Sequence, residues 1–192
     1  MATDLTSFTT IKAEQRDAVV WVWLDRPEKY HAFNKVMCDE LSGLWRSLKT
    51  DDSVRSVVLT ATGDKAFCAG ADLQSSKAFT TDYSEPYGHL AQLLRRARAS
   101  NVPLIARVNG ACMAGGMGLL SMCDMAVAAD NASFSTSEVK FGIIPAVISP
   151  YVLRAIGPRH ALRYFQSAER ISAERALAIG LVGEVVPLDG LD

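Results

Sequence analysis

The segment CMAGGMGLLSMCD, residues 112–124, carries three glycines in a pattern that otherwise predicts an apolar helix. These are Gly115, Gly116 and Gly118. Each glycine inside a helix costs about 0.5–1 kcal/mol relative to alanine. We therefore expect the backbone to approach another group closely here, a requirement that restricts the folds open to the chain.

Short β-rich segments alternate with helical patterns along the whole sequence, which predicts an α/β fold. Strands are expected at residues 18–24, 54–61, 103–110, 125–130 and 181–187. Helices are expected over 36–48, 90–97, the glycine segment, 149–168 and 172–180. The fourth helix should break at Gly157-Pro158, and the fifth should be capped by Ser172 and end at Gly180. With 192 residues, 49% of them hydrophobic, we expect one domain over residues 1–192.

Charge and cysteine content exclude several classes of protein. The net charge is −1, without a basic block, which argues against a nucleic-acid partner. The polar N-terminus does not resemble a signal peptide, and no uncharged stretch is long enough to span a membrane. The four cysteines have neither disulfide-scaffold nor zinc spacing, so we expect no metal and a reducing cytoplasmic compartment.

Several catalytic motifs are excluded by their spacing. Gly110 and Gly115 have P-loop spacing, but Gly116 and Met117 stand where the Lys-Ser/Thr pair would be needed. Neither G-x-G-x-x-G nor G-x-S-x-G occurs. Cys68 is interpreted as a small buried residue rather than a nucleophile.

Two loops of small residues, 66–73 and 109–118, each follow a predicted strand. Each could present a backbone N–H at a junction between a strand and a helix, and two converging amides would polarise one carbonyl group as an oxyanion hole. The glycines could equally serve tight turns and close helix packing. Spacing does not decide between these interpretations.

The motifs LDRPEKYHAF, KAFCAGADL, RVNGACMAGGMGLLSMCDMAVAAD, FSTSEVKFGIIP and RISAERALAIGLVGEVVP together resemble the crotonase superfamily, the enoyl-CoA hydratase/isomerase family. The resemblance implies a crotonase-like spiral of repeated ββα units and an acyl-CoA thioester substrate, with no cofactor besides its coenzyme A. It assigns the oxyanion amides to Ala71 and Gly115 and the proton carrier to Glu138. Apolar Val139, Phe141 and Ile143 would then surround Glu138 and raise its pKa.

The sequence departs from this family at Gly118, where typical hydratases carry a second glutamate. A glycine there should leave space for a branched or carboxylated acyl chain, as in the methylglutaconyl-CoA-hydratase-like branch, which this sequence also resembles. Three functions stay open. They are an enoyl-CoA hydratase, an enoyl-CoA isomerase that uses Glu138 alone, and a non-catalytic acyl-CoA-binding protein.

The resemblance also assigns binding of the coenzyme A moiety to Arg26, Ala66, Asp72 and Leu73. Asp124 is interpreted as structural, and His31 replaces an asparagine that is common in the family. Family members continue into helices that cover the acyl site, and this helical cover is expected to be missing here. A homotrimer or a hexamer of two trimers is the expected assembly.

Overall fold

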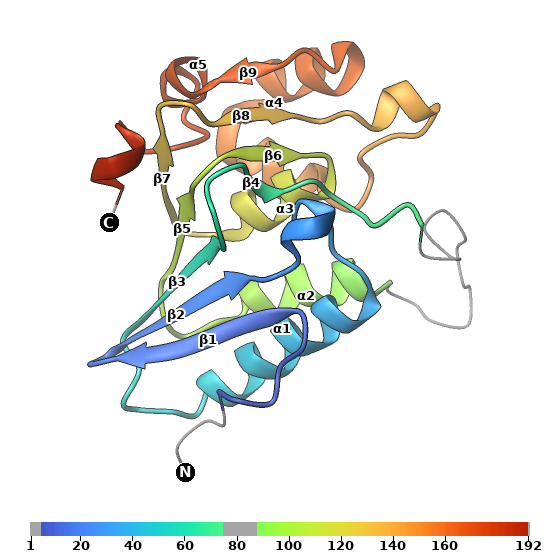
Figure 1. Cartoon of the computed structure of the whole chain (residues 1–192). Coiled ribbons are helices and arrows are strands. Elements are labelled where there is room, and N and C mark those ends of the chain that lie inside the picture. The colour runs from blue at the N-terminus through green and yellow to red at the C-terminus, as the bar shows by residue number, and fades with distance from the viewer. Residues whose placement is uncertain (1–4, 75–87, 192) are drawn as a thin grey trace.

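Two β-sheets form the centre of the computed structural model, which describes residues 5–74 and 88–191 (Figure 1). The larger sheet has the order β1-β2-β3-β5-β7-β10 and the smaller has the order β4-β6-β8-β9. The strands of the larger sheet are Ile11–Arg16, Val19–Leu24, Ser56–Ala61, Leu104–Val108, Met125–Ala129 and Glu184–Val186. Those of the smaller sheet are Ala66–Cys68, Ala111–Met113, Ser133–Ser135 and Ile171–Ser172. Only the β1·β2 and β8·β9 pairs are antiparallel among the described strands.

From β3 to β8 the chain alternates between the larger and the smaller sheet, and a helix follows each pair of strands. The α-helices are α1 (Lys35–Leu48), α2 (His89–Arg98), α3 (Gly115–Met122), α4 (Ser149–Ser167) and α5 (Ala173–Ala178). Three 3-10 helices are η1 (Pro27–Lys29), η2 (Glu138–Phe141) and η3 (Leu188–Gly190). A turn such as β5-β6-α3 has one strand in each sheet and then a helix, so the expected spiral of ββα units is confirmed.

Local signals in the sequence located the helices well. The apolar stripe of α1 is buried, as its spacing of three and four predicts. Gly157 interrupts α4 with φ +73°, which confirms the expected break. Ser172 accepts a hydrogen bond from the Arg175 amide at 3.2 Å, and Gly180 follows α5 with φ +78°.

The sequence pattern does not predict five of the strands, namely β1, β4, β6, β8 and β9. All strands of the smaller sheet have two or three residues, too few to produce a recognisable alternation. The loop of small residues expected at 66–73 therefore begins with β4. Strand β1 is longer, but it is a polar, largely exposed edge strand that resembles a loop in composition.

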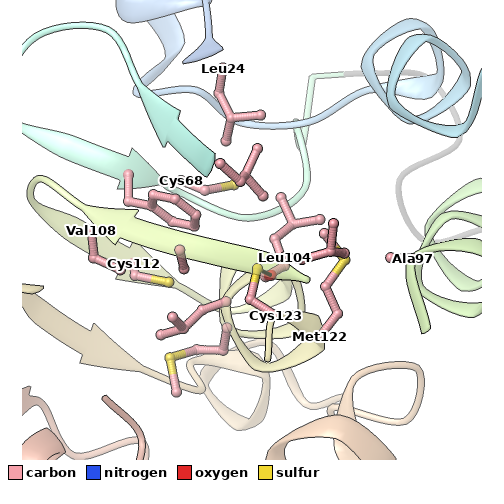
Figure 2. Packing of buried hydrophobic residues seen from close by; sticks show 14 of the residues in the cluster. Leu24, Cys68, Ala97, Leu104, Val108, Cys112, Met122 and Cys123 are labelled. Atoms are coloured by element: carbon pink, nitrogen blue, oxygen red, sulfur yellow. Dashed lines mark hydrogen bonds between the residues drawn. The ribbon is translucent and has the colours of Figure 1, made fainter. Parts of the chain in front are cut away.

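The four cysteines are free and buried. Figure 2 shows Cys68, Cys112 and Cys123 among the side chains of the core. Burial raises the pKa of Cys68 to about 12, so its thiol stays protonated and unreactive near neutral pH. The interpretation of Cys68 as a core residue is thereby confirmed. No helix within the described ranges is both long and apolar enough to cross a bilayer.

Candidate active site

The loop after β4 is held by the segment that follows η1. The Phe33 N–H donates to the Gly70 carbonyl oxygen at 2.8 Å, and the Asp72 N–H donates to the Phe33 carbonyl oxygen at 2.9 Å. These two bonds form a parallel bridge opposite Ala71, so the Ala71 N–H points away from Phe33. Gly70 makes the turn with φ +95°, a conformation that L side chains rarely adopt.

Helix α3 begins at Gly115, directly beside this loop. A Cβ atom on Gly70 would lie 3.0 Å from the Met113 carbonyl oxygen and 3.3 Å from the Gly115 nitrogen. Gly115 is the first residue of α3, where an amide has no acceptor inside the helix. Within residues 5–74 and 88–191, neither the Ala71 nor the Gly115 amide donates a hydrogen bond. The fold therefore brings the two predicted amides together, with the positive end of α3 beside them.

The glycines of α3 are explained by close packing. A Cβ atom on Gly116 would lie 2.5 Å from the Cys68 carbonyl oxygen, and one on Gly115 would lie 2.6 Å from the Phe33 ring. At such distances a side chain on either glycine would force its neighbour to shift, and at Gly116 that neighbour is backbone. Close approach and amide presentation are thus not exclusive alternatives, because the same packing brings the two loops into contact.

Pairing of β6 with β8 brings the Glu138 segment to the start of α3. Met113 lies opposite Ser135, and the Ala114 N–H donates to the Ser135 carbonyl oxygen at 2.7 Å. Glu138 follows three residues later as the first residue of η2. Its side chain is buried, and its Oε2 atom has no hydrogen-bond partner in the part of the chain that the structure describes.

Burial raises the pKa of Glu138, in the direction that the sequence predicts. The predicted cause needs correction, because Val139, Phe141 and Ile143 are 41%, 57% and 39% exposed and form no buried wall. Helix η2 instead contacts α4, which contributes to the burial. A buried carboxyl group with a raised pKa is better suited than an exposed one to serve in turn as proton acceptor and proton donor.

The free space expected at Gly118 does not exist. A Cβ atom there would lie 2.4 Å from Cγ2 of Ile148 and 3.4 Å from Cδ1 of Leu94. Ile148, at the N-cap of α4, is 2% exposed. The expectation that Gly118 leaves room for a branched acyl chain is therefore wrong, because core side chains fill the space.

Arg26 and Asp72, both predicted to bind coenzyme A, are paired with each other. The Arg26 Nη2 atom lies 2.8 Å from Asp72 Oδ2, and its Nη1 donates to the Ala32 carbonyl oxygen at 2.5 Å. The hydrogen bond from Arg26 holds the pKa of Asp72 below its usual range. Ala66 is buried in β4, whereas Leu73 is half exposed. The ion pair thus ties the η1 segment to the loop that carries Ala71.

His31 is a buried residue of the same segment, and its role was not predicted. Its φ of +57° lies in the left-handed region, which asparagine also tolerates, and its Nδ1 accepts the Arg26 N–H at 3.1 Å. His31 therefore closes the turn around η1. Asp124 is structural as predicted, since its Oδ2 accepts the Leu104 N–H at 3.0 Å.

A surface hollow of about 710 Å³ lies elsewhere, on the side of β2 that carries Trp21 and Trp23. None of the predicted site residues lines it. No cluster of three potential metal ligands occurs in the described ranges. The two amides and Glu138 therefore remain the best-supported chemical site.

Comparison with known proteins gives a consistent set of relatives. A family model described as enoyl-CoA hydratase/isomerase matches residues 14–192. Crotonyl-CoA hydratase from Syntrophomonas wolfei is 33% identical over 182 residues, which cover 94% of this chain and 70% of that protein. (E)-Benzylidenesuccinyl-CoA hydratase from Thauera aromatica is 33% identical over 177 residues, covering 92% and 69%. A crystal structure from Legionella pneumophila, described as an enoyl-CoA hydratase/isomerase (crotonase), has a TM-score of 0.90 at 41% identity and covers 96% of this chain and 73% of that one.

Proposed function

Because the chain belongs to the enoyl-CoA hydratase/isomerase family, we propose that it adds water across the C2–C3 double bond of an enoyl-CoA thioester. The observation that carries this proposal is the buried Oε2 atom of Glu138, which has no partner among the described residues and lies three residues after the strand that pairs with β6. Conjugate addition needs a group that moves protons and a group that holds negative charge on the thioester oxygen. The site offers candidates for both.

The amides of Ala71 and Gly115 are proposed to bind the thioester oxygen. As the hydroxyl forms a bond to C3, the electrons of the double bond move onto this oxygen and give an enolate. Two oriented N–H donors, aided by the positive end of α3, stabilise that charge by several kcal/mol in such sites. Their lack of acceptors within the described ranges supports this role.

Glu138 is proposed to act as both base and acid. Its carboxylate accepts a proton from the attacking water, and the resulting carboxylic acid then gives a proton to C2 of the enolate. The sum of these steps is the addition of one water molecule. The raised pKa supports this cycle, because burial makes the protonated form of Glu138 easier to reach than in a solvent-exposed glutamate.

The coenzyme A moiety is proposed to lie along the loop from β4 to Leu73. The backbone near Ala66 and Asp72 would contact it, and the half-exposed side chain of Leu73 would cover part of its apolar surface. Arg26 would approach the phosphates from beside its ion pair with Asp72. No other cofactor enters the proposed reaction.

Hydration is tested with a panel of unbranched, branched and carboxylated enoyl-CoA thioesters. Addition of water removes the conjugation between the double bond and the thioester, so the near-ultraviolet absorbance falls, and mass spectrometry detects a gain of one water. Turnover that Glu138→Gln abolishes would support the proposal. Absence of turnover on the whole panel, with an acyl-CoA still binding in calorimetry, would instead support a non-catalytic binding protein.

Isomerisation of a double bond is the second candidate, and one observation favours it. Residue 118 of α3 is a glycine, and Ile148 fills the space beside it. Helix α3 therefore contributes no carboxylate at that position, and Glu138 would act alone. A single carboxylate suffices to remove a proton from C2 and return it to C4. Incubation with a 3-enoyl-CoA would then increase the conjugated absorbance without incorporating water.

A homotrimer or a hexamer is proposed as the assembly. Apolar side chains that follow Glu138 are exposed, including Phe141 at 57% and Ile144 at 77%, and they could bury their surface against a second subunit. Sedimentation analysis of the purified protein tests this. The free, buried cysteines also fit a reducing compartment such as the cytoplasm.

A further inference from the structure

Phe33 contacts both loops that carry the proposed oxyanion amides. Its main chain forms the two hydrogen bonds that flank Ala71, through Gly70 and Asp72. Its ring lies against Gly115, since two ring carbons are 2.6 Å from the place that a Cβ atom on Gly115 would take. Phe33 therefore contacts the loop of the first amide through its backbone and the residue of the second amide through its ring.

The segment that carries Phe33 is itself held firmly. The Ala69 N–H donates to the Tyr30 carbonyl oxygen at 3.0 Å, and the Cys68 thiol lies 3.2 Å from the His31 carbonyl oxygen. On the other side, Asn34 caps α1 by accepting the Met37 N–H at 2.9 Å. Phe33 is thus anchored between the β4 loop and the start of α1, and it is 8% exposed.

The ring contact is also sterically specific. Leu90 of α2 lies 3.5 Å from the same Cβ place on Gly115, so the ring and Leu90 together limit how far the start of α3 can move. The loop that carries Ala71 lies close to the same helix end, because the Cβ place of Gly70 is 3.3 Å from the Gly115 nitrogen. The Phe33 ring is therefore a direct steric restraint on the residue that carries the second amide, beside the loop that carries the first.

We propose that Phe33 is a positioning residue that sets the separation and direction of the Ala71 and Gly115 amides. This inference rests on the proposed oxyanion function of the amides. It differs from a purely structural role because it concerns the transition state. An oxyanion hole binds the enolate more strongly than the substrate carbonyl, so a displaced amide lowers kcat far more than it weakens ground-state binding.

The test uses Phe33→Leu and Phe33→Ala in the full chain. Both changes leave the main-chain bonds to the Gly70 loop available and remove ring atoms from Gly115. Phe165→Leu, which alters a partly buried phenylalanine in α4, is the matched control. For each variant, kcat and KM are measured with the best substrate of the parent. The melting temperature of each variant is measured as well. Affinity is also measured for a saturated acyl-CoA and for a β-ketoacyl-CoA, which can bind as its enolate.

For Phe33→Leu we expect kcat to fall about tenfold and for Phe33→Ala about a hundredfold, with KM changed less than about threefold. The β-ketoacyl-CoA should lose affinity relative to the saturated acyl-CoA. Phe165→Leu should keep the parental kcat even if its melting temperature falls as much as that of the Phe33 variants. A folded Phe33→Ala protein with parental kcat and an unchanged affinity ratio would overturn the positioning role. A parent that turns over no thioester would overturn the proposed function, and this inference with it.

Discussion

The Cγ2 atom of Ile148 lies 2.4 Å from the place that a Cβ atom on Gly118 would occupy. Ile148 is the N-cap of α4 and Gly118 lies in the middle of α3, so this contact limits how closely the two helices pack there. The glycine is therefore required by its neighbour, not only by the backbone of α3. Restoring a side chain at position 118 means remodelling Ile148 as well.

Gly118→Ala should destabilise the protein although alanine favours a helix. The gain in helix propensity is about 1 kcal/mol, while overpacking a filled core costs about 1–3 kcal/mol. Gly43→Ala in α1 is the control, because nothing lies within 4 Å of its Cβ place, and it should stabilise by about 0.5–1 kcal/mol. Chemical denaturation measures both values.

The same pair can be tested by a double-mutant cycle. In the Ile148→Ala background, Gly118→Ala should be neutral or stabilising by up to about 1 kcal/mol, because the clashing methyl group is gone and the gain in helix propensity remains. An equal cost of Gly118→Ala in both backgrounds would refute the contact. The pair also predicts that Gly118→Glu alone yields a poorly folded protein, whereas Gly118→Glu with Ile148→Ala has space for the added carboxylate.

Glu138→Gln should reduce turnover by at least about 10²-fold while retaining affinity for acyl-CoA, because the amide keeps the shape and loses the proton. In the parent, the acidic limb of the kcat/KM profile should lie above pH 4.5, since burial raises the pKa of this carboxyl group. Near-parental activity of the variant on every substrate would exclude Glu138 as the proton carrier.

Glu138 should also affect the pH dependence of folding. Its pKa is raised in the folded state, so the folded protein binds the proton more strongly than the unfolded chain does. The favourable contribution is complete below pH 4.5 and is lost as the pH rises through the folded-state pKa. Glu138→Gln should remove this component, so the free energies of unfolding of parent and variant should diverge in favour of the variant towards neutral pH.

His31→Asn should fold with a stability within about 1 kcal/mol of the parent, because asparagine tolerates a positive φ and carries an oxygen that can accept the Arg26 N–H. His31→Val should cost about 1–3 kcal/mol, since a β-branched residue is strained there. Burial lowers the pKa of His31, so its contribution is complete above pH 6.5 and is lost as the pH falls through its folded-state pKa. The free energy of unfolding of His31→Asn should not show this loss when it is measured by chemical denaturation at a series of pH values. Equal stabilities for the valine and asparagine variants would argue against the turn-closing role.

Patterns among neighbouring residues predict much of the fold and part of the candidate site. The apolar stripe of α1 and the capping of α5 depend on residues near each other in sequence, so spacing alone indicated them. The contacts of Phe33 with Gly115 and of Ile148 with Gly118 join distant segments, and no single-sequence pattern contains them. Glu138 became a specific candidate only through the family motif, because a lone glutamate among polar residues has no distinguishing spacing.

Arg26 allows a structural role to be separated from a role in binding coenzyme A. Arg26→Gln removes the partner of Asp72, and the side chains of the pair are only 14% and 11% exposed, so the fold should lose about 1–3 kcal/mol. Asp72 has a lowered pKa, so its stabilising contribution is present above pH 3.8 and is lost as the pH falls through the folded-state value. Lys29→Gln removes the same charge from the neighbouring turn without breaking this pair and serves as the control.

The kinetic comparison uses one acyl group on two carriers, coenzyme A and a pantetheine that lacks the nucleotide. If Arg26 contacts the phosphates, Arg26→Gln should raise KM for the coenzyme A thioester about tenfold and leave KM for the pantetheine thioester unchanged. If Arg26 acts only through Asp72 and the Ala71 loop, the kcat of the variant should fall equally with both thioesters, because the same amide is displaced in each case. A folded variant with parental constants on both carriers would exclude both roles.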